Sequence, residues 1–184
     1  ALREAQAQAA RSTARRSETS TEDAPEERGP ARLVVGRPSR LPAGLEPETT
    51  EAADVLLHRG RLVLVDGYNL SKQHRPQLDL EAQRAWVVQL LAAGAARRGI
   101  RPVVVFDGER SSGHRGVGAR DVSVRYTPAG ITADDELVLA VEATDEPVVV
   151  VTDDRELRER VSASGVDLLG TRPFLGALTR DSCG

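Results

Sequence analysis

From residue 61 onward, three short runs of apolar residues stand out, and each is followed within two residues by an aspartate. The runs cover residues 62–65, 103–106 and 148–151, and the acids that follow are Asp66, Asp107 and the pair Asp153 and Asp154. Near-continuous apolar runs of this length are typical of parallel strands that are buried on both faces. The pattern therefore predicts a parallel sheet with aspartates at its carboxyl edge, where open α/β sheets bind ligands.

Between these runs the apolar positions follow helical spacing. The predicted helices cover residues 79–98, 132–143, 154–162 and 174–178, two further strands cover 122–126 and 166–169, and loops cover 70–77 and 108–120. Asp79 suits the start of the first of these helices and Gly99 its end. The alternation of strands and helices predicts an α/β fold in which a parallel sheet lies between two layers of helices.

The first 55 residues have a different composition. Residues 1–17 are rich in Ala, Gln and Arg, which favour helix, but they have almost no apolar stripe. Residues 18–54 contain many prolines and acids and few large apolar side chains. We therefore predict a helical tail followed by a Pro/acid-rich linker or arm over 1–55, with an edge strand possible at 32–35 and a short helix around 51–58. The single predicted domain covers 56–184.

The overall charge and composition narrow the functional class only slightly. The net charge of −3 gives the chain as a whole no attraction to nucleic acid or anionic membranes, and the one cysteine, Cys183, cannot form a disulfide within the chain. No stretch approaches the roughly 20 apolar residues of a membrane span, and no signal-peptide pattern opens the sequence. A cytoplasmic protein without a membrane partner is the expectation.

The candidate chemistry lies in acidic residues at strand ends and helix starts. The set comprises Asp66 with Asn69, Asp107, the pair Asp134 and Asp135, and the pair Asp153 and Asp154. Acids at a helix start can also act as caps. Several carboxylates at one sheet edge repel one another and need a cation, and Mg²⁺ or Mn²⁺ prefers oxygen ligands. Because the three histidines are scattered, the sequence predicts an oxygen-ligated metal site.

Four motifs carry a family resemblance: Val65–Asn69, Val105–Gly108, Thr132–Asp135 and Val151–Leu157. In this order they resemble the NYN domain of the YacP-like group, within the PIN-like nuclease superfamily. The resemblance covers about residues 62–179. It implies a three-layer α/β/α PIN-like domain with a central, mostly parallel sheet, and a metal-dependent ribonuclease activity.

The resemblance also implies roles for individual residues. The first acid of the family falls on Asp66, its amide on Asn69, its helix-start acid on Asp134, the acid of the Thr-x-Asp turn on Asp154, and an additional acid on Asp107. One or two Mg²⁺ or Mn²⁺ ions held by Asp66, Asp134 and Asp154 would activate water for phosphodiester hydrolysis, leaving a 5′-phosphate. Asn69 would position that water or a phosphate oxygen.

Two ambiguities remain within the acidic pairs. Asp135 stands beside Asp134 and Asp153 stands beside Asp154, so either member of each pair could be the metal ligand. Both pairs therefore belong to the predicted metal site.

The expected partner is RNA, with a ribosome as one way of presenting it. The candidate RNA-binding residues are Lys72, Arg75, Arg110, Arg115, Arg120 and Arg155. The three central arginines of this set lie in the Gly-rich loop after Asp107, where they could contact phosphates or simply be solvated. Tyr68 could stack on a base or be buried beneath the site.

Two rival functions follow from the same residues. A phosphoaspartate receiver or phosphatase also places acids at strand ends, but this chain has Gly67 after Asp66 and no lysine late in the sequence. The other rival is an RNA- or ribosome-binding module with little or no catalysis. The predicted function is a metal-dependent ribonuclease that cuts RNA internally.

Overall fold

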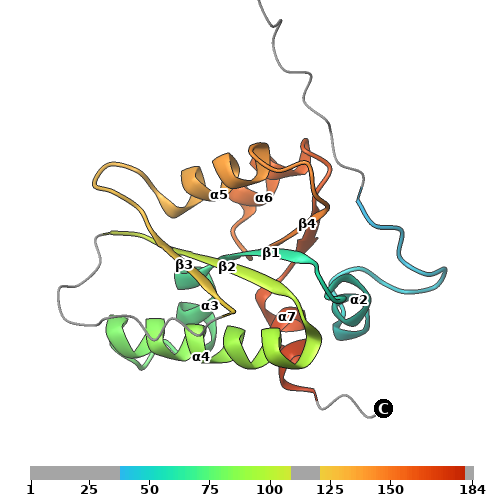
Figure 1. Ribbon diagram of the computed structural model, residues 1–184, viewed down its shortest axis with the longest axis horizontal. Helices are drawn as coiled ribbons and strands as arrows, with labels where there is room; N and C mark the ends of the chain where they lie inside the picture. The colour runs from blue at the N-terminus through green and yellow to red at the C-terminus, as the bar shows by residue number, and fades with distance from the viewer. Residues whose placement is uncertain (1–37, 109–120, 181–184) are drawn as a thin grey trace, which may run out of the picture. The chain divides into compact units, whose positions relative to one another are not determined.

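A computed structural model describes residues 38–108 and 121–180 of the chain (Figure 1). The elements are α2 Thr50–Leu56, β1 Leu62–Asp66, α3 Gly67–His74, α4 Leu80–Arg98, β2 Arg101–Phe106, β3 Ser123–Tyr126, α5 Ala133–Glu142, β4 Val148–Val151, α6 Arg155–Ser162, β5 Asp167–Leu169 and α7 Thr171–Thr179. The residues of the N-terminal tail, the candidate edge strand at 32–35 and most of the loop 108–120 lie outside the described part.

The five described strands form one sheet in the order β3-β2-β1-β4-β5, and every pairing is parallel. The chain runs outward from β1 to β2 and β3, and then returns to add β4 and β5 on the other side of β1. The direction of the strand order therefore reverses between β1 and β4. In open parallel sheets such a switch point opens a crevice at the carboxyl ends of the strands.

Helices cover both faces of the sheet and enclose two apolar cores (Figure 1). Helices α2, α3, α4 and α7 pack on one face, where Val63, Val65 and Phe106 are fully buried. Helices α5 and α6 pack on the other face, against Leu64 and Val105. Alternate residues of one strand thus serve opposite cores, which confirms the predicted three-layer α/β/α arrangement.

Two predicted boundaries near the site are wrong. Residues 70–77 do not form only a loop, because α3 begins directly after β1 and continues to His74. The sequence of α3 is mostly polar and lacks an apolar periodicity that would predict a helix. The helix is stabilised by burial of Leu70 and by the cap from Asp66. The closing helix starts at Thr171 rather than 174, since proline is tolerated in a first helical turn and Pro173 does not end it.

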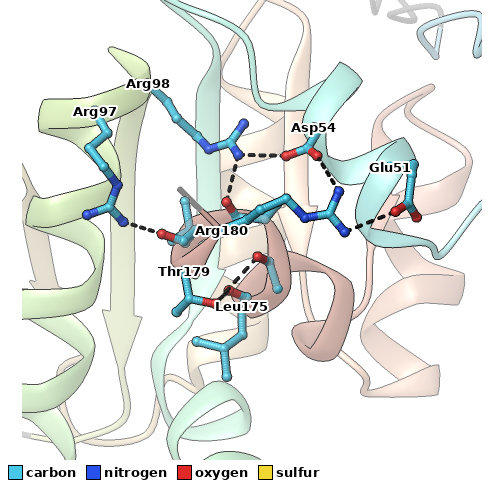
Figure 2. Close-up of polar contacts among 10 residues, drawn as sticks. Glu51, Asp54, Arg97, Arg98, Leu175, Thr179 and Arg180 are labelled. Atoms are coloured by element: carbon cyan, nitrogen blue, oxygen red, sulfur yellow. Dashed lines mark hydrogen bonds and ion pairs between the residues drawn. The ribbon is translucent and has the colours of Figure 1, made fainter. Parts of the chain in front are cut away.

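The short helix α2 is bound to the C-terminal helix by arginines (Figure 2). Arg98 at the end of α4 donates to Asp54 Oδ1 at 2.6 Å and to the carbonyl oxygen of Ala177 at 2.6 Å. Arg180 donates to Glu51 at 3.0 Å and to Asp54 Oδ2 at 3.3 Å. These cations pair with the acids of α2 while satisfying a carbonyl at the C-terminal end of α7.

Candidate active site

A cleft of about 420 Å³ opens at the carboxyl edge of the sheet, next to the switch point. We call it the acid cleft, and it is lined by Asp66, Tyr68, Asn69, Lys72, Gln73, Asp107, Thr132, Ala133, Asp134 and Asp154. These residues come from the ends of β1 and β2, from α3, and from the starts of α5 and α6. Four of the predicted site aspartates therefore meet in one place.

Asp66 is the most buried acid of the cleft, with 8% of its surface exposed. It ends β1 and caps α3, where its Oδ1 accepts the backbone N–H of Asn69 at 3.0 Å. Residue 67 is glycine, and the Phe106 ring packs directly against its backbone, where a Cβ would overlap the ring. The carboxylate is thus fixed between a strand and a helix.

Burial raises the pKa of Asp66 to about 6, because the charged form loses solvation. The negative charges of Asp134, Asp107 and Asp154 add to this effect, and the hydrogen bond from Asn69 opposes it. The pKa of Asp134 is also raised, first by burial and then by the charge of Asp154. A cation between these carboxylates would remove the repulsion.

Asp107 and Asp154 each join two elements at the rim of the acid cleft. Asp107 follows β2, and its Oδ1 accepts the N–H of Ala133 at the start of α5 at 2.5 Å. Asp154 caps α6, where its Oδ1 accepts the N–H groups of Glu156 at 2.8 Å and Leu157 at 3.1 Å. Within the described part of the chain, the bonds of both residues use only Oδ1. The second oxygen of each carboxylate therefore remains for a cation.

The second member of each acidic pair is engaged elsewhere. Asp135 accepts a hydrogen bond from Arg160 at 2.7 Å, and this bond lowers the pKa of Asp135. Asp153 accepts from the N–H of Thr171 at 3.1 Å and from its hydroxyl, while the N–H of Asp153 donates to Asn69 Oδ1 at 2.9 Å. Neither residue lines the acid cleft. Their contacts hold neighbouring elements together.

Residues 63–182 match the family of the YacP-like NYN domain. The chain belongs to this family. Among solved structures it is similar to Rae1 (YacP) from Bacillus subtilis, with 27% identity and a TM-score of 0.53 over 64% of this chain and 72% of that one. A tryptophan-to-leucine mutant of Rae1 gives 26% identity and a TM-score of 0.54 over 64% and 74%. The family indicates a nuclease-like domain acting on RNA.

No curated protein matches the sequence. Across residues 38–108 and 121–180, the structure contains no helix long and apolar enough to cross a membrane.

The cationic side chains that the sequence suggested for RNA binding lie in different surroundings in this YacP-like domain. Lys72 lines the acid cleft. The Arg75 guanidinium lies over the Trp86 ring at 5.1 Å, and Arg155 pairs with Glu159 at 2.8 Å beside a separate shallow hollow of about 480 Å³. Arg110, Arg115 and Arg120 lie outside the described residues.

Sequence reasoning missed Gln73 as a lining residue. Gln73 follows Asn69 by four positions, and residues at this spacing share one face of a helix. The signal was therefore present, but it required recognising α3.

The donor set of the acid cleft suits Mg²⁺ or Mn²⁺ better than a softer metal, because every acidic lining residue offers oxygen. Among the described residues, no three Asp, Glu, His or Cys side chains stand close enough together to hold one ion. Mg²⁺ commonly binds only one or two carboxylates directly and retains several waters. The separated carboxylates fit this mode of binding.

Proposed function

We propose that this chain is a Mg²⁺- or Mn²⁺-dependent endoribonuclease. The observation that carries the proposal is the meeting of four aspartates from four elements in one cleft, with Asp66 buried among them. Carboxylates placed in this way destabilise the fold unless they bind a cation. The family relationship supports RNA as the substrate.

Asp66, Asp134 and Asp154 would hold one or two metal ions, each bound directly by one or two of these carboxylates and otherwise through water, with Asp107 as an additional acid. A bound ion would lower the pKa of a water molecule and neutralise charge that develops on the phosphate. Asp135 and Asp153 are excluded from this proposed ligand set because Arg160 and Thr171 engage them. They act instead as positioning residues for α5 and for the turn before α6.

Asn69 would bind the substrate phosphate. Its Oδ1 accepts the N–H of Asp153, so the remaining polar group of the amide is the NH₂ donor. A donor at the wall of the acid cleft suits a phosphate oxygen, which the surrounding carboxylates would otherwise repel.

The first test is cleavage of a labelled circular RNA in Mg²⁺, Mn²⁺ or EDTA, because only internal cutting opens a circle. We expect wild type to cut with either metal, and the variant carrying Asp66→Asn and Asp154→Asn to lose cutting by about a thousandfold, roughly 4 kcal/mol of transition-state stabilisation. The matched pair Asp134→Asn and Asp135→Asn sharpens the test. Asp134→Asn should abolish cleavage, whereas Asp135→Asn should retain it.

Intact RNA with every metal would contradict the nuclease proposal and favour an RNA- or ribosome-binding module. Cutting of linear but not circular RNA would exclude the internal mode. If Asp135→Asn were inactive and Asp134→Asn active, the ligand assignment would be wrong.

A further inference from the structure

A row of cations and aromatic rings begins at the wall of the acid cleft. Tyr68 lines the cleft, and Lys72 Nζ lies 5.2 Å from the centre of its ring. Arg84 contacts the same tyrosine: its Nε donates to the hydroxyl oxygen at 2.7 Å, and its guanidinium carbon lies 5.5 Å from the ring centre. Two cations from different helices thus contact one ring of the cleft.

The row continues to the edge strand β3. The Arg84 guanidinium carbon lies 5.4 Å from the centre of the Tyr126 ring, so this one cation contacts rings from α3 and β3. Tyr126 stacks on Phe106 at 5.9 Å, and Phe106 packs edge-on against Tyr68 at 5.2 Å. The rings therefore support one another and fix the guanidinium between them.

These side chains are accessible. Lys72 is exposed, while Arg84 and Tyr126 are half-buried, in contrast to the buried Tyr68. A guanidinium held against aromatic rings keeps its charge, and it loses less conformational freedom when it binds a phosphate. The ladder of Lys72, Tyr68, Arg84 and Tyr126 is thus a preorganised cationic surface that begins at the acid cleft.

A polyanion needs such a surface here. Four aspartates line the cleft, and their negative potential repels every phosphate other than one bound through a metal. Positive charge beside the cleft offsets this repulsion for the neighbouring phosphates. A cleft of about 420 Å³ is at the small end of ligand sites, which favours one extended strand over a duplex.

We infer that Lys72 and Arg84 bind backbone phosphates of single-stranded RNA on the β3 side of the acid cleft, with Tyr68 and Tyr126 holding the Arg84 guanidinium in place. This inference rests on the proposed function, since it identifies where the substrate strand leaves the cleft. It adds Arg84, which no motif pointed to, to the proposed substrate-binding residues, and Tyr126 as a residue that positions the Arg84 guanidinium.

The test measures binding of a fluorescent single-stranded RNA to the full chain in EDTA, where no metal-dependent cutting occurs. Lys72→Ala and Arg84→Gln should each raise the Kd about three- to tenfold, and each should reduce the slope of log K against log salt by about 0.7. Arg84→Lys should retain the wild-type slope, because it keeps the charge. The control is Arg101→Ala at the amino edge of the sheet, where Arg101 pairs with Glu146 at 2.6 Å, and this variant should bind like wild type.

A cleavage assay distinguishes weaker substrate binding from a disturbed active site. In Mg²⁺, Arg84→Gln should raise KM and leave kcat close to wild type, whereas a misplaced catalytic group would lower kcat. Thermal melting of each variant checks that it is folded before its binding is compared.

The inference is wrong if Lys72→Ala and Arg84→Gln bind with wild-type affinity and salt slope, or if a duplex of the same sequence responds to them equally. Neither result contradicts the nuclease proposal, provided that the double variant Asp66→Asn with Asp154→Asn has lost cleavage activity. A wild-type chain that neither binds nor cuts RNA would overturn both.

Discussion

Two buried aspartates at opposite edges of the sheet meet very different surroundings. Asp167, at the amino end of β5, is 6% exposed and forms an ion pair with Arg61, which is 5% exposed. Ser39 donates to the same carboxylate through its backbone N–H and its hydroxyl, each at 2.7 Å. Asp66, at the carboxyl end of β1, is 8% exposed and faces other acids.

The difference separates an acid that stabilises the fold from one suited to chemistry. The carboxylate of Asp167 is compensated by a cation and hydrogen bonds, so the charge is held within the protein itself. Asp66 receives one backbone hydrogen bond and is opposed by the charges of the acid cleft. Its burial therefore costs free energy that an added cation can recover.

Removing the compensating cation should have the largest effect. Arg61→Met leaves the Asp167 charge buried and unpaired, and we expect the free energy of unfolding to fall by about 3–5 kcal/mol in urea denaturation. The double variant Arg61→Met with Asp167→Leu should recover much of this loss. The surface pair gives the control, because Arg101→Ala should cost no more than about 1 kcal/mol. If Arg61→Met lowered the free energy of unfolding by no more than Arg101→Ala does, the buried ion pair would not differ from the surface pair.

The opposite result is expected for Asp66→Asn. Because the pKa of Asp66 is raised from 3.8 to about 6 on folding, its contribution to stability is fully present below pH 3.8 and is lost as the pH rises through 6. A shift of this size corresponds to about 3 kcal/mol. Without metal, Asp66→Asn should thus be more stable than wild type by about 3 kcal/mol at pH 8 and equally stable near pH 3.

Urea denaturation in EDTA at several pH values measures this difference. If the free energies of unfolding of wild type and Asp66→Asn changed in parallel with pH, the surroundings of Asp66 would not disfavour its charged form.

Addition of metal should reduce the stability difference between Asp66→Asn and wild type, because it stabilises wild type more. At a hundred times its Kd, Mg²⁺ or Mn²⁺ should stabilise wild type by about 2.7 kcal/mol at pH 8, because it binds the folded state. Protons compete for the carboxylates, so the gain should shrink at pH 5. Thermal melting checks this, with Asp66→Asn as the comparison. An equal metal effect on both proteins would place the ion outside the acid cleft.

The smallest expected change in stability concerns Glu48. This acid lies near the carboxyl edge of the sheet, and its charge is balanced by Arg158. Its side chain accepts the N–H of Gly170 at 2.6 Å and pairs with Arg158 at 2.5 Å, while its backbone has a φ of 62°. Glu48→Ala should lower stability by about 1 kcal/mol through the lost hydrogen bonds. Glu48→Gly loses the same bonds but tolerates positive φ, so it should be about 1 kcal/mol more stable than the alanine variant. Equal urea midpoints would argue against backbone strain.

Much of the fold follows from local patterns in the sequence. The apolar runs of β1, β2 and β4 require burial on both faces, and this alone predicts a parallel sheet with acids at its carboxyl edge. The four motifs indicated the family, which the comparison over residues 63–182 confirms. Helix α3 could not be found in this way, since its sequence is polar and its stability comes from Leu70 and from the Asp66 cap.

The sequence by itself determined which acids lie at strand ends and helix starts, because burial of an apolar strand and capping of a helix depend on nearby residues. Only the tertiary structure decided which of them share a cleft. Asp134 and Asp135 differ by about 100° around α5, and a contact with Arg160 on α6 separates them. Arg84 meets Tyr126 only because β3 pairs with β2. Desolvation and charge repulsion act through space, so the strand order sets them.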